Sequence, residues 1–367
     1  MNLYFDHAAA MEPLSFPDCT DLQTAEIANQ ENPVSGAQKI IDQAASDILT
    51  ALCPDRHTRE QYGVFFTHTG TDAVNAAFAA AGSQCRTGTA ALSGGEHACV
   101  RAAVRRLSGI RQVIFPCDSN GVIAQETFDR CITEDTVLTA VHLVQPETGV
   151  IQNMPSLSAR KKSLLLVDAI QGAGKIPFDF SAVQPDFFTL SGQKLGALSG
   201  AALICRKTFL PALKKLRLEQ HSTGRVPPVL AKHLAAVLRS WVSLQEQRAF
   251  SAQELKDLLF AELERTLPGV FRRTIAENVP VSPYITHLLF PGYQGAILTR
   301  ALSGRGIITS PGSACDAETD RPSEALTWMG IPSSLAFCAL RISFSPANDR
   351  DGVCTLVRSL AEILRQY

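Results

Sequence analysis

Short apolar runs that end in polar or glycine-rich residues recur along this chain, and they limit its fold more than any other feature. Examples are YGVFFTHTGTDAVNAAFAAAG, TVLTAVHLVQPETG, SLLLVDAIQGAG and DFFTLSGQKLG. Such runs are typical of strands buried on both faces of a mostly parallel sheet. We therefore predict an α/β fold in which helices sandwich a mostly parallel central sheet. Functional residues should gather at the carboxyl ends of its strands.

The pattern changes in the second half of the chain, which predicts a smaller α+β domain. A helical stretch runs from about residue 231 to residue 267 and stops at Pro268 and Gly269. The later segments ITHLLFPG and ALRISFSP and the amphipathic end DGVCTLVRSLAEILRQY suit that smaller domain. We predict a large domain over residues 13–245, and a small domain formed by residues 1–12 and 246–367.

Charge and hydropathy exclude several classes of partner. Lysine and arginine total 34 against 35 aspartate and glutamate residues, so no net field favours nucleic acid. The N-terminal segment has no basic region followed by an apolar one, and no apolar run approaches the roughly 20 residues that span a bilayer. We expect a cytoplasmic protein that binds neither nucleic acid nor membranes.

The 10 cysteines are scattered, with no CxxC pair and no Cys/His cluster at zinc-finger spacing. We therefore expect no metal site, and we expect reduced thiols that mostly pack as small apolar residues. Cys315 differs because it lies in the glycine- and serine-containing segment ITSPGSACDAETD. A side chain there can be exposed and mobile, and a thiolate attacks sulfur readily.

Two apolar runs place an acid and a lysine at one rim of the predicted sheet. LLLV leads to Asp168, with Gln171 three residues later, and FFTL leads to Ser191-Gly192-Gln193-Lys194. Enzymes that use pyridoxal phosphate (PLP) need such a pair. The lysine amine holds the cofactor as an imine, and the carboxylate keeps the pyridine nitrogen protonated. The alternative is that Asp168 caps a helix and Lys194 is a solvated surface lysine.

The segment Thr67-His68-Thr69-Gly70-Thr71-Asp72 connects an apolar strand to an alanine-rich helix. Free N–H groups and small residues at a helix start predict a phosphate cradle, although an ordinary helix cap has the same pattern. His97, in SGGEHACV, could lie flat on a cofactor ring or serve as a structural hydrogen-bonding residue.

Taken in order, these segments resemble the cysteine desulfurases of the class V aminotransferase family, which are PLP enzymes of fold type I. The matching segments are YFDHAAA, ENPVSG, THTGTDAVN, EHACV, QPETG, DAIQGAGKIPFD, SGQK, SPGSACDAETDRPSEAL and RISFS. They extend along nearly the whole chain.

The resemblance implies a role for each matching residue. It implies Lys194 as the Schiff-base lysine, Asp168 on the pyridine nitrogen, Gln171 on the ring hydroxyl, His97 stacked on the ring, Gly70, Thr71, Ser191 and Gln193 at the phosphate, Gln145 near the substrate, and Arg341 on the substrate carboxylate. The planar donor fork of arginine suits a carboxylate, which it binds at two points. By the same resemblance, Cys315 takes the sulfur of PLP-bound cysteine as a persulfide.

Three residues depart from the family pattern at cofactor positions. Gln193 replaces a histidine, Gln145 replaces an asparagine, and Gly224-Arg225 replaces the Gly-Thr pair that reaches the partner subunit's phosphate. Gln193 and Arg225 can still donate hydrogen bonds to phosphate. Gln145 is one methylene longer than asparagine, enough to move its amide near the substrate.

We interpret the chain as a homodimeric desulfurase that converts L-cysteine to alanine and an enzyme persulfide on Cys315, with a sulfur-acceptor protein as a possible partner. One alternative is another class V reaction, namely selenocysteine lyase, amino-acid lyase or aminotransferase chemistry. Gln145 and Gln193 favour it, whereas the intact GSAC segment opposes it. The other alternative is an idle homologue that binds a partner.

Overall fold

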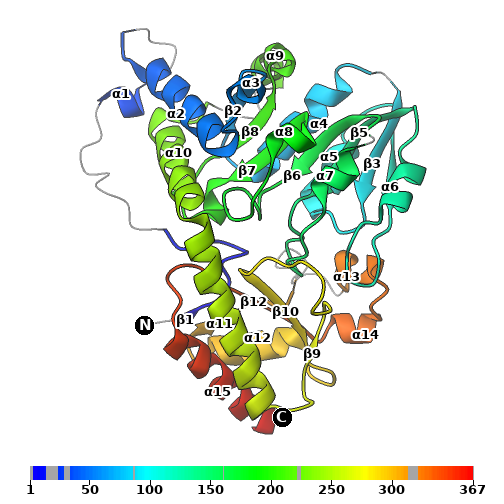
Figure 1. Cartoon of the computed structure of the whole chain (residues 1–367), viewed down its shortest axis with the longest axis vertical. Helices are drawn as coiled ribbons and strands as arrows, with labels where there is room; N and C mark the ends of the chain where they lie inside the picture. The colour runs from blue at the N-terminus through cyan, green and yellow to red at the C-terminus, as the bar shows by residue number, and fades with distance from the viewer. Residues whose placement is uncertain are drawn as a thin grey trace.

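The structure is a computed structural model, and it describes residues 3–13, 24–28, 34–85, 87–159, 161–220, 225–312 and 321–366. A 7-stranded sheet forms the centre of the larger part of the molecule, and a 3-stranded sheet forms the centre of the smaller part (Figure 1). The predicted α/β class is therefore confirmed.

The 7-stranded sheet has the order β2-β8-β7-β6-β5-β3-β4. Strand β8 runs antiparallel to β2 and β7, and the other neighbouring pairs are parallel. The strands are β2 (Tyr62–Thr67), β3 (Gly88–Ser93), β4 (Ile110–Phe115), β5 (Thr136–His142), β6 (Leu164–Asp168), β7 (Phe187–Ser191) and β8 (Ala201–Arg206). Because β5, β6 and β7 are parallel, their carboxyl ends at His142, Asp168 and Ser191 lie along one edge.

Helices cover both faces of this sheet, as the apolar runs predicted. Phe188 of β7 belongs to the core shared with α2, α7, α8 and α10, while the adjacent Phe187 belongs to the core shared with α4, α5 and α9. Successive side chains of a strand point to opposite faces, so a strand between two helical layers must be apolar throughout. These helices are α2 (Ala37–Leu52), α4 (Gly70–Gly82), α5 (Ala98–Val104), α7 (Met154–Ser158), α8 (Phe180–Val183), α9 (Leu210–Gln220) and α10 (Pro228–Ser243).

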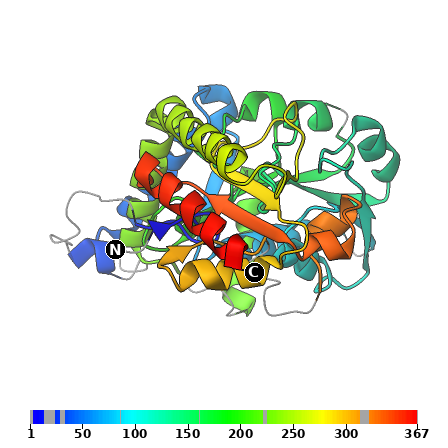
Figure 2. The ribbon, with the colours of Figure 1, turned by 90° about the horizontal axis from the view of Figure 1, so that it is seen from below.

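The smaller part surrounds the antiparallel sheet of β9 (Arg272–Arg273), β10 (Ile285–Leu289) and β12 (Ala339–Ser343). Helix α15 (Arg350–Gln366) packs against α11 (Gln245–Thr266) and α12 (Gly295–Ser303), as Figure 2 shows. Strand β1 (Leu3–Tyr4) pairs with β11 (Ile307–Ile308). The remaining elements are α1 (Thr24–Ile27), α3 (Arg56–Arg59), α6 (Gln125–Cys131), α13 (Glu324–Trp328), α14 (Ser333–Ala336) and the 3-10 turns η2 (Gly192–Lys194) and η3 (Lys207–Phe209).

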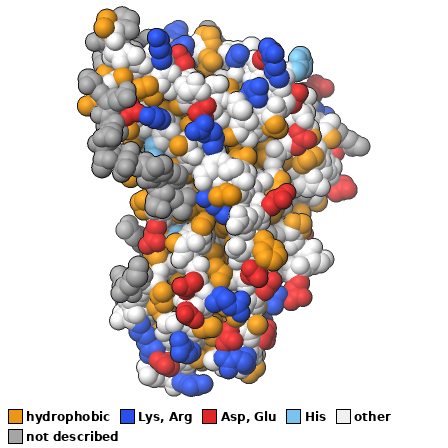
Figure 3. Space-filling model, turned by 60° about the vertical axis from the view of Figure 1, so that its left-hand side comes forward, with side chains coloured by type: hydrophobic (Ala, Val, Ile, Leu, Met, Phe, Trp, Pro, Cys, Tyr) orange, Lys and Arg blue, Asp and Glu red, His pale blue; other side chains and the backbone are white. Residues whose placement is uncertain are grey.

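The long helical stretch in the middle of the chain joins the two parts. Helix α10 ends and α11 begins at Leu244, and α11 continues into the smaller part (Figure 1). Acidic and basic side chains are interspersed on the face drawn in Figure 3. Among the described helices, none combines the length and the apolar character that crossing a membrane requires.

Candidate functional site

A cavity of about 260 Å³ lies at the carboxyl ends of β5, β6 and β7, with walls from both parts of the molecule. The predicted site residues that line it are Gly70, Thr71, His97, Asp168, Gln171, Ser191, Gln193, Lys194 and Arg341. Segments far apart in the sequence thus surround one cavity. The edge of the sheet at which functional residues were predicted forms part of the cavity wall.

Lys194 reaches the cavity from the turn η2 that follows β7. The turn is tight, because a Cβ at Gly192 would lie 2.8 Å from the Gly200 carbonyl oxygen. The half-buried Lys194 donates a hydrogen bond from Nζ to the carbonyl oxygen of Ala9. The alternative of a solvated surface lysine therefore does not describe its position.

Asp168 lies buried at the end of β6 and has few compensating donors. Its Oδ1 accepts hydrogen bonds from the Ile170 N–H at 3.1 Å and from the Thr189 hydroxyl at 2.9 Å. Burial raises the pKa of Asp168, and the nearby Glu96 carboxylate raises it further. A cation in the cavity would relieve both effects, so the site fits the protonated pyridine nitrogen of PLP.

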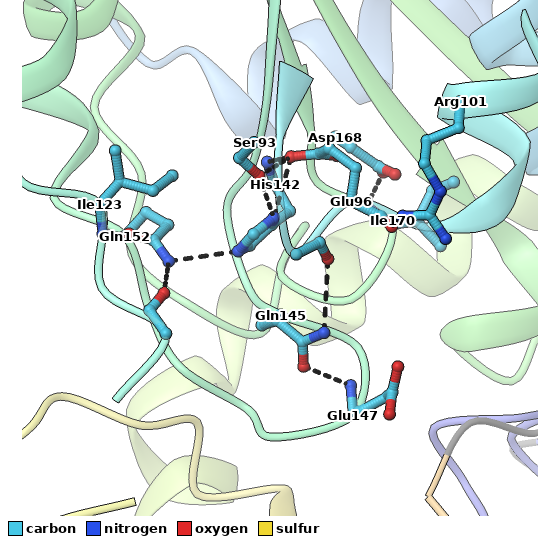
Figure 4. A network of polar contacts seen from close by, with 12 residues as sticks. Ser93, Glu96, Arg101, Ile123, His142, Gln145, Glu147, Gln152, Asp168 and Ile170 are labelled. Atoms are coloured by element: carbon cyan, nitrogen blue, oxygen red, sulfur yellow. Dashed lines mark hydrogen bonds and ion pairs between the residues drawn. The ribbon is translucent and has the colours of Figure 1, made fainter. Parts of the chain in front are cut away.

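Behind Asp168 lies a buried network that the sequence analysis did not identify (Figure 4). Glu96 Oε1 accepts hydrogen bonds from the Ser93 hydroxyl at 2.6 Å and the His142 N–H at 2.7 Å, and it lies 2.9 Å from His142 Nδ1. Burial opposes ionisation of Glu96, but the His142 charge and these hydrogen bonds outweigh it and lower the pKa of the carboxyl. The Glu96 carboxylate of this network is the one that raises the pKa of Asp168.

The start of α4 forms a cradle that a larger residue would fill. A Cβ at Gly70 would lie 2.6 Å from Ile170 Cδ1 and 3.3 Å from Ser191 Cβ. Thr69 and Asp72 form a capping box, with the Thr69 hydroxyl accepting from the Asp72 N–H at 3.1 Å. A capped helix start with exposed N–H groups and a positive dipole end fits a phosphate.

His97 serves as a helix cap and also lines the cavity. Its Nδ1 accepts a hydrogen bond from the Cys99 N–H at 3.2 Å at the start of α5, and the Cys99 thiol lies 3.0 Å from the same nitrogen. In the neutral ring the proton is then on Nε2. His97 therefore has the structural hydrogen-bonding role that the sequence left open, and it also lies in the wall of the cavity.

Arg341 on β12 is buried and held from two sides. It donates to Asp6 Oδ1 at 2.8 Å and to the Pro146 carbonyl at 3.1 Å. Its Nε is buried without a hydrogen-bond partner among the described residues. A buried guanidinium with an unused donor, in the wall of a cavity, fits a carboxylate ligand.

Three predicted residues are not among those that line the cavity. Gln145 is buried, and its Oε1 accepts hydrogen bonds from the N–H groups of Glu147 at 2.7 Å and Thr148 at 2.6 Å, so it stabilises its own turn. Arg225 is exposed and lines a second groove beside α2 and β2. Cys315 lies outside the described residues.

Further residues complete the cavity wall although the sequence analysis did not assign them. They are Glu96, Cys99, Arg101, His142, Glu147 and Glu324. Arg101 of α5 and Glu324 of α13 form an ion pair at 2.6 Å that joins the two parts of the molecule. Glu96, Glu147 and Glu324 lie in the quoted segments EHACV, QPETG and SPGSACDAETDRPSEAL, which was a usable signal, but nothing in the sequence indicated that Glu324 pairs with Arg101.

The described residues contain no cluster of three or more histidine, cysteine or acidic side chains that could hold a metal ion. The cysteines within the described ranges are free thiols.

The chain is similar to known proteins along most of its length. Residues 34–356 match the family Aminotransferase class-V. Cysteine desulfurase 2 of Trichormus variabilis is 29% identical, over 83% of this chain and 79% of that protein. Cysteine desulfurase IscS of Vibrio atlanticus is 28% identical, over 93% of this chain and 87% of that protein. A solved NifS-like protein, 22% identical, superposes with a TM-score of 0.83 over 100% of both chains.

Proposed function

We propose that this chain, which belongs to the class V aminotransferase family, is a PLP-dependent cysteine desulfurase. It would take sulfur from L-cysteine, leave alanine, and hold the sulfur as a persulfide on Cys315. The observation that carries this proposal is the cavity that joins Asp168, Lys194 and Arg341. The desulfurases among its relatives support the substrate.

In this proposal the residues around the cavity hold the cofactor by its separate groups. Asp168 would pair with the ring nitrogen, His97 would cover a ring face, and Lys194 would bond the cofactor covalently. The ring hydroxyl would face Gln171, whose Nε2 donates to the Ala8 carbonyl at 2.8 Å. Gly70, Thr71, Ser191 and Gln193 would surround the phosphate. When bound, PLP would supply an electron sink for bonds at the substrate α-carbon.

The protein's own groups would position the substrate and move protons. Arg341, oriented by Asp6 and the Pro146 carbonyl, would bind the carboxylate. The Lys194 amine would take and return a proton next to the α-carbon. The Cys315 thiolate would form an S–S bond as the substrate C–S bond breaks. The carbon would keep that electron pair and take up protons to give alanine.

Gln145 favours a second candidate, another class V reaction on an amino acid. Its amide stabilises its own turn and is not among the groups that line the cavity, so a substrate would not meet the amide that the family pattern supplies there. Amino-acid lyase or aminotransferase chemistry would use Lys194, Asp168 and Arg341 and leave Cys315 idle.

Incubating the purified protein with PLP and a panel of amino acids separates these functions. With dithiothreitol added to reduce the enzyme persulfide, a desulfurase releases alanine and sulfide from L-cysteine, whereas an aminotransferase produces keto acids, and an idle homologue produces neither. We expect alanine and sulfide from L-cysteine. Keto acid as the main product would replace the first candidate by the second.

A further inference from the structure

Helix α13 belongs to the smaller part of the molecule, yet both of its ends meet residues 94–97 of the larger part. This short segment connects β3 to α5. At the last residue of α13, a Cβ on Gly94 would lie 2.6 Å from Trp328 Cγ, so the indole ring lies directly on the Gly94 backbone. At the first residue of α13, Glu324 reaches the segment through Arg101.

Arg101 connects Glu324 with the backbone next to His97. Its Nε lies 2.6 Å from Glu324 Oε2, and its Nη1 donates to the carbonyl oxygen of Glu96 (Figure 4). Glu96 directly precedes His97, which caps α5 and lines the cavity. Two polar contacts in series therefore connect the smaller part with the residue that would cover the cofactor ring.

The larger part restrains the same segment by different atoms. A Cβ at Gly95 would lie 2.9 Å from His142 Cε1, and the Glu96 carboxylate is bonded to Ser93 and His142. Within the described parts of the chain, the Glu96 carbonyl accepts a hydrogen bond from Arg101 and from no other group. The main chain just before His97 thus depends on Arg101 for its polar contact.

Helix α13 also packs against the strand that carries Arg341. Leu326 and Met329 of α13 lie in one hydrophobic cluster with Ala339 of β12. Arg341 follows Ala339 by two residues on the same strand. One helix therefore contacts both the strand proposed to bind the substrate carboxylate and the segment proposed to cover the cofactor.

The ion pair matters for geometry more than for stability. The side chain of Arg101 is 11% exposed and that of Glu324 is 55% exposed. A pair with one exposed partner stabilises a fold little, because water and salt compete for the charges. Its effect on a reaction can be larger, since a displacement of about 1 Å at an active site can cost about a hundredfold in rate.

We propose that Glu324 is a positioning residue that acts through Arg101 to hold Glu96 and His97 in place at the cavity. The inference rests on the place of His97 at the cofactor ring in the proposed function, but not on which amino acid reacts. It assigns a role to an ion pair that the proposed mechanism does not use.

The first test compares variants of Glu324 in the PLP-loaded protein. In Glu324→Ala, kcat should fall about tenfold while KM stays within about twofold, because Arg341 still binds the carboxylate. The visible circular dichroism of bound PLP should also change, since it reports how the ring is held. Glu324→Gln keeps an oxygen acceptor for the Arg101 Nε–H, so it should retain most of the rate and the wild-type spectrum.

Glu362→Ala is the matched control. Glu362 pairs with Arg305 at 2.6 Å, its side chain is 61% exposed, and it is not among the residues that line the cavity. It should keep the rate and the spectrum of the wild type. Thermal unfolding should shift by no more than a few degrees in either alanine variant.

A double-mutant cycle tests whether Glu324 acts through Arg101. Adding Glu324→Ala to Arg101→Met should cause no further loss of rate, because the contact to be broken is already absent. The same tenfold loss in both backgrounds would show that Glu324 acts independently and would overturn the proposal. A wild-type rate and spectrum in folded Glu324→Ala would overturn it as well.

Hydrogen exchange of the cofactor-free protein gives a measurement that needs no reaction. The peptide spanning residues 94–104 should exchange faster in Glu324→Ala than in the wild type or in Glu362→Ala. Equal exchange in all three proteins would contradict the proposed contact. Failure of the proposed function would show separately, as the absence of alanine and sulfide from the wild type.

Discussion

At the scale of single residues, the site depends on ionisable side chains that are buried. Asp168, Glu96 and Arg341 lie in the wall of one cavity with 7%, 2% and 3% of their surfaces exposed. Such groups exert stronger fields than exposed ones, and each needs a counter-charge or hydrogen bonds. Reversing or neutralising one of these charges should therefore change the binding of a charged ligand in the cavity more than it changes the packing of the protein.

Lys194 gives the first prediction. Borohydride reduction of the PLP-loaded protein should fix the cofactor to the peptide containing Lys194, because this amine alone among the described lysines lines the cavity. Lys194→Ala should lose the covalent adduct and keep its fold. Lys256→Ala is the control that keeps the adduct. Peptide mapping that finds the cofactor on another lysine would contradict the assignment.

Glu96 gives a prediction about stability and pH. Glu96→Gln removes the charge that pairs with His142 inside the protein, and we expect a loss of about 3 kcal/mol in the free energy of unfolding. The folded-state pKa of Glu96 lies below its ordinary value, so its contribution is present above the unfolded pKa of about 4.3 and lost as pH falls through the folded pKa. Below that range, wild type and variant should converge.

Denaturant unfolding of Glu96→Gln at several pH values checks this prediction. Glu254→Gln, at an exposed position of α11, is the control and should match the wild type throughout. A difference between Glu96→Gln and wild type that does not shrink at acid pH would show that packing, not charge, is lost.

At the scale of elements, the starts of helices α4 and α5 line the cavity, and the described residues that flank 313–320 lie beside it. Gly312 directly precedes residues 313–320, and Glu324 follows them after three residues and lines the cavity. A Cβ at Gly312 would lie 3.8 Å from Glu147 Oε2, and Glu324 pairs with Arg101. The described residues that flank 313–320 thus lie at or beside the wall of the cavity.

Gly70→Ala should weaken cofactor binding through α4. The added Cβ would lie 2.6 Å from Ile170 Cδ1 and 3.3 Å from Ser191 Cβ, so the Ile170 side chain must move and Ser191 must give slightly at the proposed phosphate site. We expect about tenfold weaker PLP binding and about 1–3 kcal/mol lower stability. Absorbance titration with PLP measures the binding, and thermal unfolding measures the stability.

Gly304→Ala is the control for this change, because its new Cβ would come no closer than 3.5 Å to any atom. It should bind PLP as the wild type does. Equal PLP affinity in Gly70→Ala would mean that the start of α4 does not hold the phosphate.

Cys315→Ala tests the proposed reaction. At equal PLP occupancy it should still bind L-cysteine and shift the spectrum, because the proposed function assigns those steps to Lys194, Asp168 and Arg341. Release of alanine should fall by about a hundredfold or more, since the sulfur acceptor is lost. Aminotransferase chemistry would be indifferent to the change.

Cys99→Ala is the matched control, because the Cys99 thiol lies in the cavity wall. It should keep most of the alanine formation. Equal rates in Cys315→Ala and wild type would show that Cys315 is not the acceptor, and a loss confined to Cys99→Ala would move that role to Cys99.

At the scale of the whole molecule, we propose that two chains complete each other's sites. Arg225 is exposed beside α2 and β2 and is not among the residues that line the cavity of its own chain. That position agrees with a contact between Arg225 and the phosphate of PLP bound by the partner subunit. We also propose the predicted boundary near residue 245, because Leu244 separates α10 from α11.

Arg225→Ala should weaken PLP binding by about fivefold to tenfold through loss of a charged hydrogen bond. Lys214→Ala, in the same groove, is the control and should bind normally. Mixing inactive Lys194→Ala chains with Arg225→Ala chains should restore a tight site, because one hybrid site then has both Lys194 and a partner's Arg225. Absence of this restoration in dimers of confirmed mixed composition would rule out the shared site.

The sequence by itself determined the elements and the rim of the sheet. Hydrophobic periodicity is a local signal, so it located β6 and β7 and showed that Asp168 and Lys194 follow buried strands. The capping pattern around Thr69 likewise needs only neighbouring residues, and it predicted where α4 begins.

Only the tertiary structure decided how the side chains are used, because burial and electrostatic coupling depend on residues far apart in the chain. Gln145 stabilises its own turn, His97 is both a cap and a wall of the cavity, and Arg101 pairs with Glu324 across the two parts. Lys175 looked like any lysine in the sequence. Packing of Trp241 and Tyr284 around it buried its charge, and no local pattern encodes that environment.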